Sequence, residues 1–532
     1  MAKSMKKLIS IDTKHFFTGI TPGAYVDTGG IWSEAQGINV FRDLVNTTQA
    51  GLLQASPDMT TLSASVDGTP MAQTSTNTND GTGDATKMYY ITDEGFIGRL
   101  DATGVTPGAP TEVRAEESQS ALVWPGTGLE TLQTANSGLS VFYFHNLSGS
   151  SATNLSAAIG VYGDINSSNP AFTDAFATEY KAAVNGLQQN VTLNRPTHKF
   201  RQKIYHGHDY RVGSISEDSS GNPVNTFEDL DLPKNQEVTA LEDDGNFLVI
   251  GSSNNVAGDA RAFSDTNVWF WDTSSVDINR VWTIKDAYIT GLRRVGNLIY
   301  ALCPNGLWAF NYQTRPFKVY PLGRNGKDSV ESQTNPDSKV WIANDAIGSI
   351  NNAVVWGGNQ TINTFGELLN GLRDTNTRHQ PYADLSASTG AMTMVATDAN
   401  FDNVIVGTSG TSETGYFPIN NSGGTGLTAK TIYFPLGKQT VIQRIEVILG
   451  EPLASGDILN IDVQADEDES ENTDGSTWGI ISFAVHGAKK KIQINRVKTV
   501  ENLKVLLTFA GGNVKIKAVN IYGHAVADAH IK

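Results

Sequence analysis

A short phrase recurs through the middle of this 532-residue chain: an apolar run, a turn that carries glycine, and a second run rich in aromatic residues. It is clearest as VTALEDDGNFLVIGSS with VWFWD within 238–272, and as ITGLRRVGNLIYAL with GLWAFN within 289–311. Weaker or irregular copies lie at 87–100, 129–163, 198–216, 347–358 and 392–420. A period of roughly 40–60 residues with a strand pair in each copy is typical of a β-propeller. The repeat therefore predicts a ring of about seven blades.

The composition divides the chain into three parts. Residues 1–55 form an N-terminal segment with a possible strand, INVFRDLV. Propellers often close by borrowing a strand from the opposite terminus, so we expect this segment to complete the last blade near Ile405. Residues 56–422 hold the propeller, and a glycine-rich linker follows. Residues 427–532 contain seven or so short strands with alternating apolar residues, which predicts a C-terminal β-sandwich in an all-β chain.

One window departs from the strand pattern. DAFATEYKAAVNGLQQ, at 174–189, places Phe176, Tyr180 and Ala183 at helical spacing. The spacing predicts a helix inserted in a loop between blades.

Charge and cysteine content exclude several classes of function. With 39 Lys and Arg against 55 Asp and Glu, the net charge of −16 repels phosphates. We therefore expect no sequence-specific nucleic acid binding, although an acidic inner channel is compatible with DNA that slides without sticking. The single cysteine, Cys303, permits no intrachain disulfide and favours folding in a reducing cytoplasm. We expect no secretory signal and no membrane span, because no apolar run is long enough.

Two clusters of potential metal ligands occur in the sequence. His206 and His208 would point to the same face of a strand, but zinc needs a third or fourth ligand and no second His or Cys cluster accompanies them. In Asp466–Asp474, oxygen-bearing residues recur at every second position. An EF-hand loop needs Gly at its sixth position and Glu at its twelfth, where this chain has Glu471 and Thr477. We therefore interpret the first cluster as a polar strand edge, with Tyr205 and Tyr210 packing on the other side, and the second as a hairpin turn, and we predict no metal.

No motif specifies catalysis. The chain contains no G-x-S-x-G elbow and no phosphate-binding P-loop, and spacing selects no pair of facing carboxylates. Five tryptophans of the repeats could stack on sugars, but their place in the repeated strands favours packing between blades. These are Trp269, Trp271, Trp282, Trp308 and Trp356. We predict no catalytic residue and no cofactor.

The repeat phrases, together with KTIYFPLGKQTVIQRIEVILGEPLASGDILNIDVQAD and WGIISF, resemble β-propeller virion proteins of tailed bacteriophages. Such proteins occur in tail nozzles, hubs and tips, and the resemblance covers roughly residues 230–530. It implies a non-enzymatic structural subunit that forms a cyclic oligomer around the tail axis. The implied partners are other tail or connector proteins during genome ejection. Synthesis in the host cytoplasm and release by lysis would place it in the virion, and no functional residues carry over.

Two other hypotheses stay open. A carbohydrate-directed receptor-binding or depolymerase tail-tip protein would expose aromatic side chains beside a pair of facing carboxylates. A scaffold of the WD type would repeat a Trp-Asp ending in each blade, whereas Trp271-Asp272 occurs once.

Overall fold

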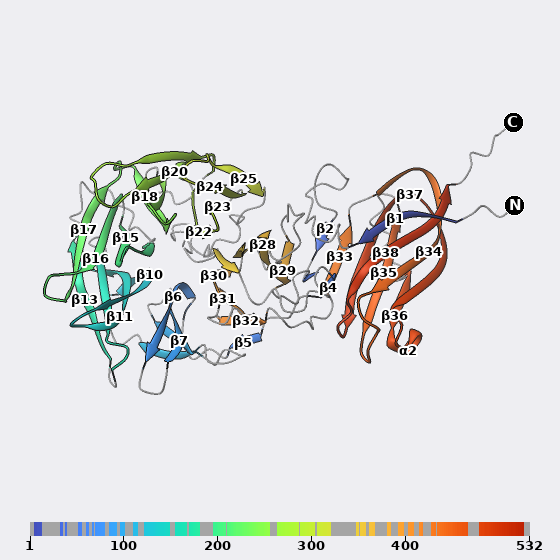
Figure 1. The fold of residues 1–532 in the computed structure, drawn as a ribbon, viewed down its shortest axis with the longest axis horizontal. Helices are drawn as coiled ribbons and strands as arrows, with labels where there is room; N and C mark the ends of the chain where they lie inside the picture. The colour runs from blue at the N-terminus through green and yellow to red at the C-terminus, as the bar shows by residue number, and fades with distance from the viewer. Residues whose placement is uncertain are drawn as a thin grey trace. The chain divides into compact units, whose positions relative to one another are not determined.

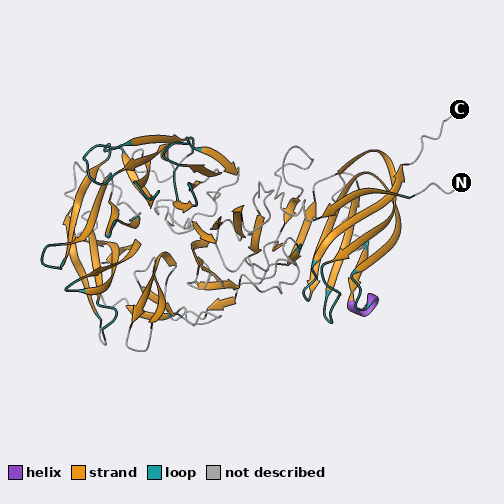
Figure 2. Cartoon of the chain, in the orientation of Figure 1, coloured by secondary structure: helices purple, strands orange, loops and turns teal. Residues whose placement is uncertain are grey.

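In the residues that it describes, the computed structural model consists almost entirely of strands and has one short helix, α2 (Phe483–His486) (Figure 2). The residues that the structure describes are 5–12, 32–35, 38–39, 52–55, 60–62, 66, 68, 70–79, 84–92, 96–101, 110–114, 122–148, 155–167, 170–180, 195–208, 210–255, 263–286, 288–303, 306–320, 347–350, 352–357, 361–367, 380–384, 392–397, 403–408, 414–418, 427–431, 434–465 and 478–525. The chain forms two compact units: 60–360 with 386–416, and 1–59 with 361–385 and 417–532.

The first unit is a propeller of four-stranded antiparallel sheets in which consecutive strands pair in order (Figure 1). The strands of its first sheet are, in order, β6 (Pro70–Asn79), β7 (Asp84–Thr92), β8 (Ile97–Asp101) and β9 (Thr111–Arg114). The second sheet consists of β10 (Leu122–Thr134), β11 (Gly138–Ser148), β12 (Leu155–Gly163) and β13 (Ala171–Tyr180). The third consists of β14 (Thr197–Phe200), β15 (Lys203–His208), β16 (Arg211–Glu217) and β17 (Pro223–Asp231).

Two further complete sheets follow, and then a sheet whose strands divide between the units. The complete sheets are β18 (Gln236–Asp243), β19 (Leu248–Asn255), β20 (Phe263–Trp271) and β21 (Arg280–Ile284), and then β22 (Gly291–Val295), β23 (Leu298–Cys303), β24 (Gly306–Phe310) and β25 (Phe317–Tyr320). In the next sheet, β26 (Ile347–Ile350) and β27 (Asn352–Gly357) belong to the propeller unit, whereas β28 (Thr361–Glu367) and β29 (Gln380–Asp384) group with the second unit.

The last propeller sheet is completed by a strand from the N-terminal part of the chain. It consists of β30 (Met392–Thr397), β31 (Asn403–Thr408), β32 (Thr414–Pro418) and β5 (Thr60–Leu62), with Tyr416 opposite Thr60. The closing strand thus lies just beyond the predicted segment 1–55, and the strands described within that segment pair elsewhere. The innermost strands contact one another in the order β6, β10, β14, β18, β22, β26 and β30, and β30 contacts β6 again.

Apolar residues are buried between neighbouring sheets, which is what joins the blades into a ring. One core cluster combines Val249 and Phe270 of one sheet with Ile299 and Phe310 of the next. Another combines Leu100 of the β6–β9 sheet with Ile405 of the closing sheet. Each blade alone would expose one of these apolar faces to water, so the interfaces stabilise the ring as a whole.

An aromatic ring covers a glycine on the next strand in three consecutive sheets. Tyr90 lies opposite Gly98, Tyr143 opposite Gly160, and His206 opposite Gly213. A Cβ atom at Gly160 would lie 2.0 Å from Cζ of Tyr143, and a Cβ atom at Gly213 would lie 2.6 Å from Cε1 of His206. His206 therefore occupies the place that tyrosine has in the two preceding blades.

Gly160→Ala is expected to destabilise the propeller by about 2–3 kcal/mol, because the buried Tyr143 ring has to leave its position. Urea unfolding monitored by the fluorescence of the blade tryptophans measures this cost. Gly296→Ala is the control for glycine replacement, since no heavy atom lies within 4 Å of its Cβ position, although its φ of +60° adds a smaller backbone cost. A Gly160 variant no less stable than the control would contradict this packing.

The predicted helix at 174–189 is not found in its described part. Ala171–Tyr180 is strand β13, which pairs with β12. Phe172 packs on Tyr143 and Phe176 packs on Phe142, so the two rings lie on opposite faces of the sheet. The register between β12 and β13 is irregular between these two positions. A partner strand thus overrode a local helical pattern.

The second unit contains an eight-stranded antiparallel sheet. The path runs β1 (Lys6–Asp12), β38 (Ile516–Ala525), β34 (Phe434–Leu449), β37 (Lys491–Gly511), β33 (Leu427–Thr431) and β2 (Trp32–Ala35), while β35 (Ile458–Ala465) pairs with β37 and β36 (Gly479–Ser482). The alternating residues expected to be apolar and inward are fully buried, among them Ile445, Val447 and Ile521. The N-terminal strand β1 therefore adds to the C-terminal sheet and does not complete a blade.

Glu446 is a buried carboxylate in this sheet. Its oxygens accept hydrogen bonds from Gln493 (3.0 Å) and Asn520 (3.2 Å), and Lys491 Nζ lies 2.9 Å away. Burial alone would raise the pKa of Glu446, but these donors outweigh it and lower the pKa to about 2.

Glu446→Gln is expected to cost about 2 kcal/mol at pH 7, because charge-assisted hydrogen bonds are lost. The contribution is present above the ordinary pKa of the carboxyl group and is lost as the pH falls toward 2. Hydrogen exchange of β34 and β38 at pH 7 reports the change, which should be absent in the propeller strands. Unchanged protection of β34 in the variant would show that the network contributes nothing.

Among the described residues, no helix has the length and apolar character needed to cross a membrane.

Candidate functional site

A cavity of about 770 Å³ lies at the centre of the propeller, lined by the innermost strands. Polar side chains dominate part of its wall, including Thr74, Glu130, His198, Glu242 and Arg293. Such a volume is in the range of pockets that hold a small molecule or hydrated ions.

Polar contacts link these innermost strands from blade to blade. Thr74 of β6 donates a hydrogen bond to Glu130 of β10 (2.9 Å), and Thr197 of β14 donates to the carbonyl of Leu129 (3.2 Å). Arg293 of β22 lies 3.4 Å from the hydroxyl of Ser349 on β26. These contacts, together with the His198 cluster described next, form a polar belt around the cavity.

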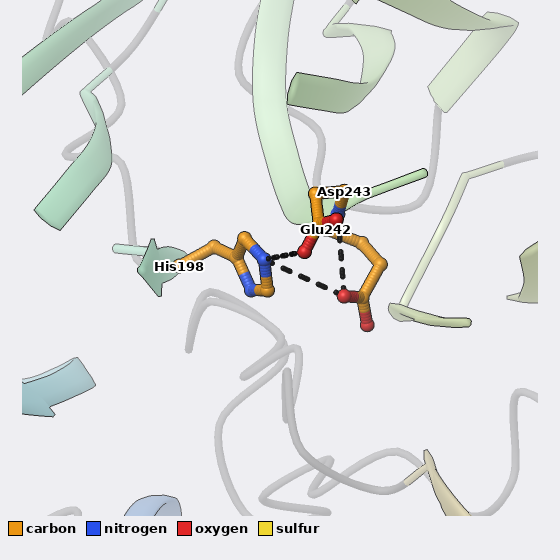
Figure 3. A group of neighbouring side chains, drawn as sticks. All are labelled: His198, Glu242 and Asp243. Carbon is orange, nitrogen blue, oxygen red and sulfur yellow. Dashed lines mark hydrogen bonds and ion pairs between the residues drawn. The ribbon is translucent and has the colours of Figure 1, made fainter. Parts of the chain in front are cut away.

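The centre of the belt is a group of three side chains, His198 of β14 with Glu242 and Asp243 at the end of β18 (Figure 3). Nε2 of His198 lies 2.8 Å from Oδ2 of Asp243 and 3.5 Å from Oε1 of Glu242. The group therefore ties two neighbouring blades together across their inner edge.

Burial alone would lower the pKa of His198, but the charge of Glu242 and the hydrogen bond to Asp243 outweigh it, and the pKa is raised. Glu130 on the adjacent blade acts in the same direction. Burial would raise the pKa of Asp243, but the hydrogen bond from His198 lowers it on balance. The cluster thus stabilises positive charge at Nε2 of His198.

Arg294 of β22 holds the opposite side of both carboxylates. Its Nη1 lies 3.1 Å from Oδ1 of Asp243, and its backbone N–H donates to Oε2 of Glu242 (3.2 Å). The backbone N–H of Gly245 also donates to Oδ1 of Asp243, at 2.6 Å. These bonds fix the orientation of the carboxylates and leave Oδ2 of Asp243 and Oε1 of Glu242 toward the histidine.

Sequence reasoning missed this cluster, although one signal for it is readable. When the two clearest repeat copies are aligned at their Gly-Asn turns, Glu242-Asp243 falls on Arg293-Arg294. Opposite charges at equal positions of neighbouring blades indicate contact between the blades. His198 gives no such signal, because its copy of the repeat is irregular and has no Gly-Asn turn.

Within the described parts of the chain, His206 and His208 are not grouped with further metal-ligating side chains. Nε2 of His206 donates to Oδ1 of Asn225 (2.9 Å), and its ring packs on Phe144 and Phe227. The ring of His208 packs edge-on against Phe227. Both histidines are therefore buried against aromatic rings and do not lie on the polar strand edge expected from the sequence. The proposed turn at Asp466–Asp474 lies outside the described residues.

The tryptophans lie in the blades, as predicted. Trp271, Trp308 and Trp356 are buried, and Trp269 and Trp282 are half-buried against the interblade cores. Cys303 is fully buried, and burial raises the pKa of its thiol. These five tryptophans are therefore buried or half-buried against the blade cores.

Comparison with known proteins gives structural similarities only. No family model and no curated protein sequence matches the chain. It is similar to a streptogramin B lyase structure, with 12% sequence identity over 68% of this chain and 96% of that chain and a TM-score of 0.40. It is also similar to the Neurospora crassa Pan2 WD40 domain, with 11% identity over 69% of this chain and 96% of that chain and a TM-score of 0.40. A third similar structure is the computationally designed Ika8 protein, with 14% identity over 68% of this chain and 99% of that chain and a TM-score of 0.37. At these values the similarities carry no inference about activity.

Proposed function

We propose that this chain is a structural virion protein of a bacteriophage tail, a wall element of the nozzle or hub that assembles around the tail axis for genome delivery. The proposal rests on the resemblance of residues 230–530 to propeller proteins of phage tails and on the organisation of the chain. It is a non-enzymatic role.

The observation that carries the proposal is the way the chain anchors its propeller. Strand β1 pairs with β38, and β2 pairs with β33, so segments before and after the propeller join one sheet. A ring held at both of its chain ends resists pulling better than a ring attached through a single flexible linker. This organisation suits a subunit that bears load in an assembled wall.

We further infer that the propeller has seven blades and that the C-terminal unit is a β-sandwich. Seven inner strands in cyclic contact favour the first inference, with β28 and β29 completing the blade begun by β26 and β27. The long β37 favours the second, because β34 pairs along its first half while β35 and β33 flank its second half. A strand shared in this way can run from one layer of a sandwich into the other.

Two features of the propeller argue against a DNA path through a single propeller and against a carbohydrate-directed function. The central cavity is of small-molecule size, so a DNA path would have to be enclosed by several subunits and not by one propeller. The five tryptophans of the repeats are buried or half-buried against the blade cores, which gives no support to the carbohydrate-directed alternative.

The proposal is tested by locating the chain in particles produced from the genome that encodes it. We expect it in the tail by immunogold labelling, and we expect particles made without its gene to lack infectivity. Degradation of host polysaccharide by the purified chain would instead favour the carbohydrate-directed alternative.

A further inference from the structure

We propose that His198, Glu242 and Asp243 form a binding site for a zinc ion at the wall of the central cavity (Figure 3). The three side chains offer one imidazole nitrogen and two carboxylate oxygens, which all lie within 4.8 Å of one another. This donor set is one that zinc accepts, with the remaining coordination position left for water.

The spacing of the donor atoms fits one shared ion. Ligands that each lie about 2.0–2.2 Å from zinc in tetrahedral or octahedral geometry are about 3.0–3.5 Å from one another. Nε2 of His198 is 2.8 Å from Oδ2 of Asp243 and 3.5 Å from Oε1 of Glu242. Small rotations of these side chains are enough to admit the ion.

Surrounding donors position the ligand oxygens. Oδ1 of Asp243 accepts hydrogen bonds from Arg294 and Gly245, and Oε2 of Glu242 accepts from the backbone of Arg294. The oxygens opposite to these, Oδ2 and Oε1, are the ones that face His198. Outer hydrogen bonds that orient first ligands in this way are a regular feature of protein metal sites.

The local charge also favours a cation. Glu130, Glu242 and Asp243 bring three negative charges toward His198, and Arg294 contributes one positive charge on the far side. An imidazole ligand discriminates against Mg²⁺ and Ca²⁺, which prefer oxygen donors alone. Because His198 and Glu242 line the cavity, the site has an open path for the ion.

The competing explanation is an ordinary ion pair between blades that binds no metal. The two differ in their response to zinc. Protein treated with EDTA and dialysed is titrated with zinc chloride by calorimetry, and hydrogen exchange is measured with and without zinc. We expect one equivalent to bind with micromolar or tighter affinity, and protection to increase in β14 and β18 and not in the second unit.

Two variants and one control separate the site from binding elsewhere. His198→Asn and Glu242→Gln should each weaken zinc binding at least about tenfold. His486→Asn, which alters a histidine of α2 in the second unit, should leave binding unchanged. Magnesium chloride should not compete with zinc.

Three results would overturn the proposal: no zinc binding at about 100 µM, equal affinity in the His198 variant, or protection confined to other strands. Since the exchange measurement uses the wild-type chain, the test holds even where a variant fails to fold.

Discussion

Lowering the pH from about 6.5 to about 3 should destabilise the propeller by up to about 5 kcal/mol through His206 alone. This side chain is 1% exposed. Burial is the main cause that lowers its pKa to about 3, the positive charge of Arg195 acts in the same direction, and the hydrogen bond to Asn225 offsets part of the effect. The folded protein therefore keeps the imidazole neutral where the unfolded chain would already be protonated.

The sign of this dependence follows from proton binding. Between the two pKa values the unfolded state holds one proton more than the folded state at this site, so the free energy of unfolding rises with pH. Above about 6.5 the contribution of His206 is constant, and below that it falls by about 1.4 kcal/mol per pH unit until the pH reaches about 3.

Urea unfolding between pH 7 and pH 4, followed by tryptophan fluorescence, measures the dependence. The matched variant is His206→Gln, which keeps a donor for Asn225 and does not titrate. The variant should be less stable than the wild type at pH 7, and the difference should shrink as the pH falls. Parallel pH profiles for the two proteins would contradict the assignment of a neutral, buried His206.

The second large effect is expected at Phe270, where replacement by alanine should cost about 3–5 kcal/mol. Phe270 of β20 is fully buried and lies edge-on to Phe310 of the next blade, with ring centroids 6.2 Å apart. It also contacts Phe247 and Tyr312 edge-on. Its loss would leave a cavity at the interface between two blades, which the rigid neighbouring sheets can fill only in part.

Phe317→Ala is the matched control, because Phe317 is an aromatic residue of the same blade pair that is 46% exposed. This control should change the free energy of unfolding by less than about 1 kcal/mol. Equal effects of the two replacements on urea unfolding would show that the interface between blades does not carry the stability of the ring.

Much of the propeller could be predicted from the sequence because its unit is local. Val238–Asp243 and Leu248–Ile250 form adjacent strands joined by a short turn, so the repeated phrase contains its own pairing partner. The closing strand β5 has three residues and gains its role only from β32, which lies more than 300 residues away along the chain. Its position therefore could not be read from a local pattern.

The candidate site, too, could be predicted only where the repeat pattern brings its residues together. Glu242 and Asp243 could be placed opposite Arg294 by aligning repeat copies, because the ring makes copies neighbours. His198 depends on a blade whose turn is formed by Arg201 and Gln202, both with positive φ, and this blade is an irregular copy of the repeat phrase without the Gly-Asn turn. Similarly, the packing of His206 over Gly213 could be recognised only after the pairing register of their two strands was known.

The most direct test of the proposed structural role is electron cryo-microscopy of particles produced from the genome that encodes this chain. The proposal predicts density for its propeller and its strand-rich second unit in several copies, related by cyclic symmetry around the tail axis. Absence of the chain from the tail, or its presence as an isolated copy outside the tail wall, would contradict the proposal.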